Sequence, residues 1–242
     1  MQILVWILSN KRTHIFLCHT MAQKFSKLYD KAATNLVISN SAFVDPVLTP
    51  VKQYRNEDVL KIGLISNLNE NKGLSDFIQS IKELRRQGVN IQGVLAGPTS
   101  TPQDAKTIET AQKDLGEALD YRGALYGKDK AQFYADIDIF IFPTRNEAQP
   151  TVIAEAMAQG IPILSRDLGC IKSQVGPCGA VFKMDKDFPS AAIEWVTDNI
   201  NILNDLKKQA RKSFLADREK AIHIAQNLLT SVASSCENCE YD

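Results

Sequence analysis

The fold follows from residues 138–165, which read DIFIFPTRNEAQPTVIAEAMAQGIPILS. Residues 138–142 form an almost continuous apolar run, which is typical of a strand covered on both faces of a sheet. We expect a helix from Pro150 to Gln159, ended by Gly160, and then a second strand over residues 161–165. A strand, a helix and a strand at this spacing predict a parallel sheet wrapped by helices.

The same alternation covers most of the chain after residue 58. Short apolar runs predict strands over residues 59–66, 90–96 and 119–122. Amphipathic stretches predict helices ending before Gly88, over 103–118, over 128–135, and over most of 187–232. The predicted fold class is therefore α/β, with a Rossmann-like parallel sheet and helices on both of its faces.

The first 58 residues have a different organisation. Strands are expected over 14–19 and 35–39 with a helix between them, and residues 45–50 have the composition of a linker. Two or three strands cannot close a domain alone, so this region is interpreted as part of a second α/β domain. The predicted division is 1–50 for this remnant and linker, 51–232 for the main domain, and 233–242 for a polar tail.

Composition excludes several classes of protein. Lys and Arg total 28, as do Asp and Glu, so a nucleic-acid partner is not expected, and membrane contact is at most peripheral. The apolar residues 2–8 lack a basic flank and a cleavage site, which argues against a signal peptide and for a cytoplasmic protein. The five cysteines are scattered and odd in number, which disfavours a disulfide framework and favours a reducing compartment. Cys236 and Cys239 are interpreted as part of a frayed terminus and not as a metal site.

A ligand site is expected at the carboxyl ends of the strands, where open α/β sheets bind their ligands. Three strand-to-helix junctions fall there: residues 66–73, 97–103 and 143–151. In the third, Pro150 suits the first helical position, where a missing N–H costs nothing. The free N–H groups of Thr151 and Val152, together with the helix dipole, would then bind an anion such as a diphosphate.

Two acidic residues flank this helix N-terminus. Glu155 lies one turn inside the helix on the same face as Thr151, where its carboxylate could accept hydrogen bonds from both hydroxyls of a ribose. Glu147 precedes the helix and could reach a sugar attached beyond the diphosphate. The alternative is that both acids are stabilised by the helix dipole and bind no ligand.

Residues 147–163 resemble the signature of retaining GT-B glycosyltransferases of family 4, which has the form E-G-(F or L)-(G or P)-x-x-x-x-E-A-M-A-x-G-x-P-V. Ala148 and Gln149 replace the usual Gly and apolar residue, which affects the expected shape of the sugar pocket. The resemblance implies a C-terminal domain that binds a UDP- or GDP-sugar, and transfer of the sugar to a hydroxyl acceptor with retention. It implies Glu147 as the catalytic residue, surface polysaccharide synthesis as the setting, and no cofactor or metal.

The other two junctions are similar to further segments of that family. Residues 66–73 resemble G-R-L-x-x-x-K-G, in which Arg and Lys hold the diphosphate; Lys72 is kept, whereas Asn67 replaces the Arg and should bind pyrophosphate more weakly. Gly97 and Gly123 match glycines beside the donor, although a plain turn role is the alternative for both.

Residues 14–20 and 36–41 resemble the end of the family's acceptor-binding domain, most of which is absent from this chain. His19 is expected to line the cleft without a catalytic role, and His223 receives no role. The competing hypothesis is an incomplete or non-catalytic module that binds a sugar nucleotide and requires a partner chain.

Overall fold

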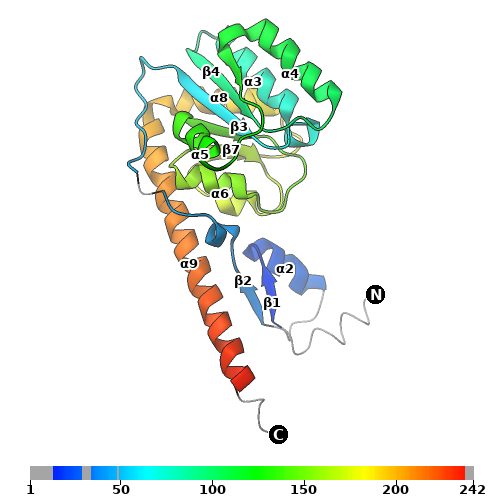
Figure 1. Ribbon diagram of the computed structural model, residues 1–242, viewed down its shortest axis with the longest axis vertical. Helices are drawn as coiled ribbons and strands as arrows, with labels where there is room; N and C mark the ends of the chain where they lie inside the picture. Colours follow the sequence, from blue (N-terminus) through cyan, green and yellow to red (C-terminus); the bar gives the residue numbers. More distant parts are fainter. Residues whose placement is uncertain (1–12, 29–33, 48, 238–242) are drawn as a thin grey trace.

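A computed structural model describes residues 13–28, 34–47 and 49–237 of the chain. Most of them form an α/β domain around one parallel sheet, which confirms the predicted fold class (Figure 1). Its six strands lie in the order β5-β4-β3-β6-β7-β8. They are β3 (Leu60–Ile65), β4 (Ile91–Ala96), β5 (Leu119–Tyr121), β6 (Ile139–Phe142), β7 (Ile163–Arg166) and β8 (Gly179–Phe182).

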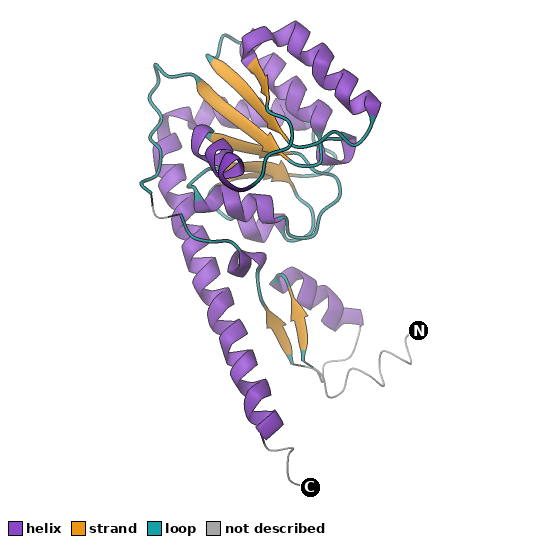
Figure 2. Cartoon of the chain, in the orientation of Figure 1, coloured by secondary structure: helices purple, strands orange, loops and turns teal. Residues whose placement is uncertain are grey.

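Two layers of helices cover this sheet (Figure 2). Right-handed crossovers place helices on one face of the sheet while successive strands are added in one direction. They place helices on the other face after the direction of strand addition reverses. Accordingly α3 (Leu74–Arg86), α4 (Pro102–Leu115) and α8 (Phe188–Asn199) pack together. The second layer contains α5 (Gly127–Asp136), α6 (Thr151–Ala158), α7 (Ile171–Val175) and α9 (Leu203–Glu237). Short 3₁₀ turns η2 (Glu70–Lys72), η3 (Gly116–Ala118) and η4 (Ile200–Ile202) connect these elements.

The N-terminal segment is a small βαβ unit beside the lower part of α9 (Figure 1). It consists of β1 (His14–Phe16), α2 (His19–Leu28) and β2 (Asn35–Val37), followed by the 3₁₀ turn η1 (Asn40–Phe43). Strands β1 and β2 pair in parallel, and both β2 and η1 contact α9. None of the helices within the described ranges is long and apolar enough to cross a membrane.

Some element boundaries differ from the sequence-based predictions. Helix α6 begins at Thr151, because Pro150 has an extended backbone and occupies the N-cap position instead of the first helical turn. Strand β7 begins two residues later than expected, and α7 and β8 were not predicted at all. Helix α9 continues to Glu237, into the stretch that was interpreted as a polar tail. Residues 2–8 and Cys239 lie outside the described ranges.

A disulfide joins the N-terminal segment to the main domain, which the scattered cysteines did not predict. Cys18 follows β1 and Cys170 precedes α7, and their Cα atoms lie 5.9 Å apart although 152 positions separate them in the sequence. Both side chains are buried. The expectation of unbridged cysteines is therefore wrong for this pair, because the fold brings together residues whose spacing along the chain gives no sign of contact. Cys178 is a free, buried thiol.

A buried ion pair attaches α9 to the start of β6. The Lys207 ammonium lies 2.9 Å from a carboxylate oxygen of Asp138, and each side chain is 1% exposed. Asp138 also accepts hydrogen bonds from the backbone N–H of Lys61 at 3.2 Å and from the Lys52 ammonium at 3.1 Å. Burial lowers the pKa of Lys207 despite the nearby charge of Asp138. Asp138 therefore compensates the charge of a lysine that has no access to water.

Replacing Asp138 with Asn should destabilise the domain strongly, because it leaves Lys207 buried without a counter-charge. We expect the free energy of unfolding in urea at neutral pH to fall by about 3–5 kcal/mol. Lys52→Ala removes a partner that is 40% exposed and should cost about 1 kcal/mol or less. The pKa of Lys207 is lower in the folded than in the unfolded chain. At pH values between these two pKa values, the unfolded chain therefore binds more protons. Asp138 raises this pKa, so in Asp138→Asn the buried lysine loses its proton at a lower pH than in the wild type. The variant then gains stability with rising pH before the wild type does, and the deficit should shrink as the pH rises toward 10. Equal costs for the two variants would contradict this assignment.

Candidate functional site

The site lies where the strand order of the sheet reverses. From β3 the chain proceeds to β4 on one side, and it later returns to place β6 on the other side. The loops that follow β3 and β6 consequently face each other across a crevice at the carboxyl edge, as in other doubly wound sheets. A hydrogen bond of 2.7 Å from the backbone N–H of Arg145 to the carbonyl of Asn71 joins the two loops. The first and third predicted junctions are thus in direct contact.

Gly73 permits this close approach. It has a left-handed φ of 79°, and a Cβ at this position would lie 2.4 Å from Pro143 Cγ and 2.6 Å from the Pro143 carbonyl oxygen. The turn before it is capped by Asn69, whose side chain accepts from the Lys72 N–H at 3.0 Å. A glycine after Lys72 therefore fixes the position of the lysine relative to the β6 loop.

Lys72 and Glu147, predicted from separate motifs, form an ion pair across the crevice. The Lys72 ammonium bonds to Oε1 of Glu147 and lies 3.4 Å from the carbonyl of Asn146. Both side chains are about one quarter exposed. An ammonium group has three donors, so Lys72 can hold Glu147 and still donate to an incoming anion.

The N-terminus of α6 opens beside this ion pair. Pro150 has no side-chain oxygen with which to cap the helix, so the first N–H groups, those of Thr151, Val152 and Ile153, lack intrahelical acceptors. Thr151 is exposed and Val152 is half-buried. The predicted anion site is therefore moved by one residue relative to the expected helix start, and its donors remain available.

Glu155 is held by two residues of α5. Oε1 accepts a hydrogen bond of 2.7 Å from the Lys130 ammonium, and Oε2 accepts one of 2.7 Å from the Tyr134 hydroxyl. Burial, followed by the charge of Glu155, raises the pKa of Tyr134 well above its usual value, so the hydroxyl stays protonated and donates. Sequence reasoning missed Lys130 and Tyr134. Their spacing of one helical turn, directly after the Gly123 junction, was the available signal.

Gly97 and Gly123 lie together at the ends of β4 and β5. The N–H of Gly97 donates to the Gly123 carbonyl at 2.6 Å, and the Gly97 carbonyl accepts from the Tyr121 hydroxyl at 3.0 Å. Gly97 has a φ of 117°, and a Cβ at this position would lie 1.8 Å from the carbonyl oxygen of Ser66. This geometry gives Gly97 a turn and packing role, and donor contact by either glycine stays a prediction.

The replacement of the expected arginine by Asn67 leaves few free cations around the crevice. Asn67 is exposed, and its side chain is too short to reach as far as a guanidinium. Arg145 and Arg166 lie nearby, but both bond to the same oxygen of Asp76, at 2.8 and 2.9 Å. Lys72 and Lys130 are therefore the cations that directly contact the two predicted acids.

Gln149 bonds to the N-terminal segment, and its effect on the shape of a sugar pocket stays a prediction. It is 6% exposed and points into the N-terminal segment. Its Oε1 accepts from the N–H of Asn40 at 2.8 Å, and its Nε2 donates to the carbonyl of Leu17 at 3.2 Å. His19 borders a cavity of about 130 Å³ beside these contacts, whereas His223 is exposed on α9 near Asn227.

Replacing Gly73 with Ala should disturb the crevice more than the same change at Gly88, which has a similar φ of 84° and open space around it. Gly88→Ala should cost about 1–2 kcal/mol of unfolding free energy from the left-handed backbone alone. Gly73→Ala carries that cost and a clash with the Pro143 backbone, so we expect it to cost at least about 1 kcal/mol more. Urea unfolding of both variants tests this, and equal losses would show that the approach of the two loops is not tight.

Comparisons with known proteins show the family and the fold of this chain. Residues 59–198, more than half of the chain, match the family model described as "Glycosyl transferases group 1". The chain is 34% identical over 97 residues to a GDP-mannose-dependent alpha-mannosyltransferase of Mycolicibacterium smegmatis; the match covers 40% of this chain and 26% of the relative. It is 25% identical over 159 residues to the capsular polysaccharide biosynthesis glycosyltransferase CapM of Staphylococcus aureus, with coverage of 64% and 41%.

Solved structures show the same fold. The pneumococcal O-GlcNAc transferase GtfA, solved with UDP and GlcNAc, superposes with a TM-score of 0.72 at 14% identity, over 92% of this chain and 45% of that one. A GtfA/B complex gives a TM-score of 0.71 at 17% identity, over 91% and 45%. The chain thus spans less than half of the length of these relatives. Its α/β fold is that of the GT-B glycosyltransferases, and the chain belongs to the group 1 glycosyltransferase family.

Proposed function

We propose that this chain is the donor-binding half of a retaining glycosyltransferase of family 4, which transfers a sugar from a nucleoside-diphosphate sugar to a hydroxyl acceptor. The observation that carries the proposal is the convergence of Lys72, Glu147 and the open N-terminus of α6 at the crevice beside β3. Two motifs far apart in the sequence, residues 66–73 and 143–152, supply one cation, one acid and a set of N–H donors. Together they fit a diphosphate that carries a sugar.

Each group has a distinct part in this proposal. The N–H groups of Thr151 and Val152 and the ammonium of Lys72 bind the diphosphate, with Asn67 adding at most an amide N–H. Their positive charge stabilises the departing diphosphate, which is the main catalytic contribution, and no metal is required for it. Glu147 orients the donor sugar and supports the charge that develops on it. Glu155 accepts hydrogen bonds from the ribose.

The relatives support the donor class and the setting. A GDP-mannose-dependent enzyme and a transferase solved with UDP both resemble this chain, so the donor is proposed to be a UDP- or GDP-sugar. A capsular polysaccharide transferase is among the relatives, which favours the synthesis of a surface polysaccharide. A cytoplasmic location is part of the proposal and rests on the sequence alone. The acceptor-binding half would come from a partner chain or from sequence beyond these 242 residues, and the GtfA/B complex provides a precedent for partner chains.

Calorimetric titration with UDP and with GDP tests the donor site. We expect one of them to bind, and Lys72→Ala and Glu155→Ala each to weaken it by about tenfold or more, because each removes hydrogen bonds to a charged group. Lys82→Ala is the matched control: Lys82 pairs with Asp114 on the outer surface of α3 and α4, so its loss should leave the affinity unchanged. Absence of nucleotide binding, or nucleotide affinities equal to the wild type in Lys72→Ala and Glu155→Ala, would contradict the donor-site assignment.

A second candidate is a non-catalytic module that binds a sugar nucleotide and acts only beside a partner chain. Asn67 in place of the arginine, and the pairing of Lys72 and Lys130 with acids, favour it. Release of free sugar from the donor by the isolated chain distinguishes the two. Hydrolysis that is abolished in Glu147→Gln would support the enzyme. Tight nucleotide binding with no turnover, even after acceptors are added, would favour the non-catalytic module.

A further inference from the structure

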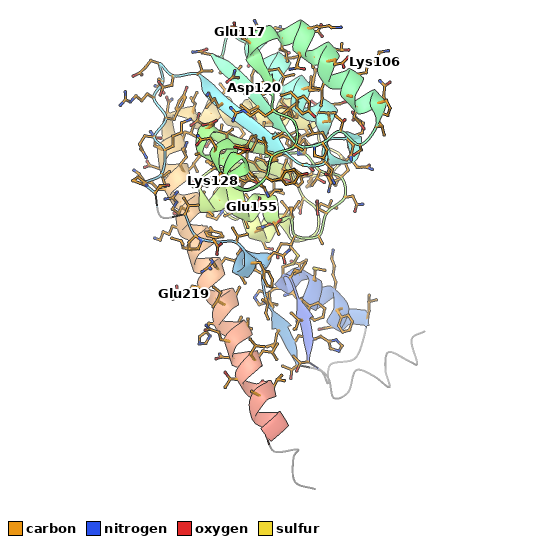
Figure 3. The ribbon with its side chains drawn as sticks, viewed as in Figure 1. Lys106, Glu117, Asp120, Lys128, Glu155 and Glu219 are labelled. Atoms are coloured by element: carbon orange, nitrogen blue, oxygen red, sulfur yellow. A yellow bond between two sulfur atoms is a disulfide. The ribbon has the colours of Figure 1, made fainter. Side chains whose placement is uncertain are left out.

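Helix α5 holds Glu155, the acid to which the proposed function assigns the ribose. The sequence motifs give no reason for this contact. Lys130 and Tyr134 lie four residues apart on one face of α5, and both reach Glu155 on α6. Figure 3 shows Glu155 on α6 beside the start of α5, where Lys128 is marked. The carboxylate therefore has one positive and one neutral donor, each on a different oxygen.

The Tyr134 hydroxyl has little choice of partner. Tyr134 is 4% exposed, and its ring packs at the edges of Phe133 and Phe140, with centroids 5.4 and 6.1 Å away. Apart from Glu155, the Val152 carbonyl at 3.4 Å is the remaining acceptor that its described contacts offer. A buried aromatic ring thus fixes the hydroxyl, and the hydroxyl fixes Oε2 of Glu155.

The Glu155 carboxylate keeps unused acceptor capacity. Two carboxylate oxygens offer about four lone-pair sites, of which Tyr134 and Lys130 use one each. The Glu155 side chain is 26% exposed, so the remaining sites are open to a ligand. Two such sites, held in a fixed orientation, match the adjacent 2′- and 3′-hydroxyls of a ribose.

Charge gives Lys130 a second effect. An unpaired carboxylate one turn inside α6 would repel a diphosphate at the N-terminus of that helix. The Lys130 ammonium at 2.7 Å neutralises it, and the Lys130 side chain is 31% exposed. Glu155 can therefore serve the ribose without weakening the binding of the diphosphate next to it.

We propose that Lys130 and Tyr134 are positioning residues that orient Glu155 for a cis-diol, so that the site selects ribonucleoside diphosphates over their deoxy counterparts. This inference rests on the proposed function, since it refines the ribose end of the same donor site. A pocket built to bond to a hydroxyl rejects the analogue that lacks it, because its own polar groups are left without partners. An α5–α6 contact that only stabilises the fold would produce no such selectivity.

The test is the ratio of the dissociation constants for the deoxy and the ribo ligand, measured by calorimetry. UDP and GDP are each compared with their 2′-deoxy and 3′-deoxy forms, on the wild type, Tyr134→Phe and Lys130→Gln. We expect a wild-type ratio of about 10 or more, falling to roughly 1–3 in both variants. Partial unfolding of a variant divides both affinities by the same factor, so the ratio is insensitive to it.

Two matched variants serve as controls. Tyr54→Phe removes a buried hydroxyl near Asp138, at the opposite edge of the sheet, and Lys128→Gln removes an exposed charge from α5 itself. Both should keep the wild-type ratio. Pyrophosphate, which has no ribose, should bind to Tyr134→Phe as it does to the wild type, and more weakly to Lys130→Gln because Glu155 is then uncompensated.

The outcomes separate this inference from the proposed function. A wild type that binds neither UDP nor GDP overturns both. A wild type that binds one of them but accepts its deoxy forms equally well overturns the assignment of the ribose to Glu155. A wild type that discriminates, with the ratio unchanged in Tyr134→Phe and Lys130→Gln, leaves the donor site intact and overturns the role of α5.

Discussion

The close approach of three backbone loops at the carboxyl edge of the sheet is the constraint on which the site depends. Strand β3 lies between β4 and β6, so the loop after it must contact the loops that follow both neighbours. Gly73 lies against Pro143 on one side, and Gly97 lies against the carbonyl of Ser66 on the other. Any side chain at either glycine would separate the loops, and Lys72 and Glu147 would then no longer meet. The functional groups are therefore positioned by residues that carry no side chain.

The electrostatics of the crevice follow from this closeness. Glu147 is paired with Lys72 and Glu155 with Lys130, so each acid that could repel an anion has a compensating cation within hydrogen-bond distance. These pairs are partly exposed, which makes their own contribution to stability small. Their effect is to orient two acids beside a helix N-terminus that attracts anions. Each of these two ion pairs is formally neutral, so under the proposed function Lys72 shares its donors between Glu147 and the diphosphate, and the first N–H groups of α6 supply the remaining donors.

Local patterns were sufficient to predict most of the sheet and the three junctions. The continuous apolar run of β6 and the 3.6-residue periodicity of α3 are both visible in residues that are adjacent in the sequence. Contacts between segments that are distant in the sequence leave no such local pattern. The Cys18–Cys170 disulfide spans 152 positions, and the bonds of Lys130 and Tyr134 to Glu155 depend on how α5 packs against α6. Strand β8 was missed because its apolar run, residues 180–182, is only three residues long and the strand is half-buried at the sheet edge. Pro150 was placed one position too far inside the helix, since proline fits both the N-cap and the first turn.

Gln149 connects the loop after β6 to the N-terminal segment. It stands between Glu147 and Thr151, yet its side chain bonds to the backbone of Leu17 and Asn40. The disulfide makes a second connection at the same place, because the N–H of Cys170 donates to the carbonyl of Ala148 at 2.7 Å. The two departures from the family signature thus lie where the N-terminal segment is attached. A polar residue suits position 149 because it satisfies backbone groups that an apolar residue would leave buried and unpaired. The position of the N-terminal segment is consequently coupled to the loop that carries Glu147, and movement of one displaces the other.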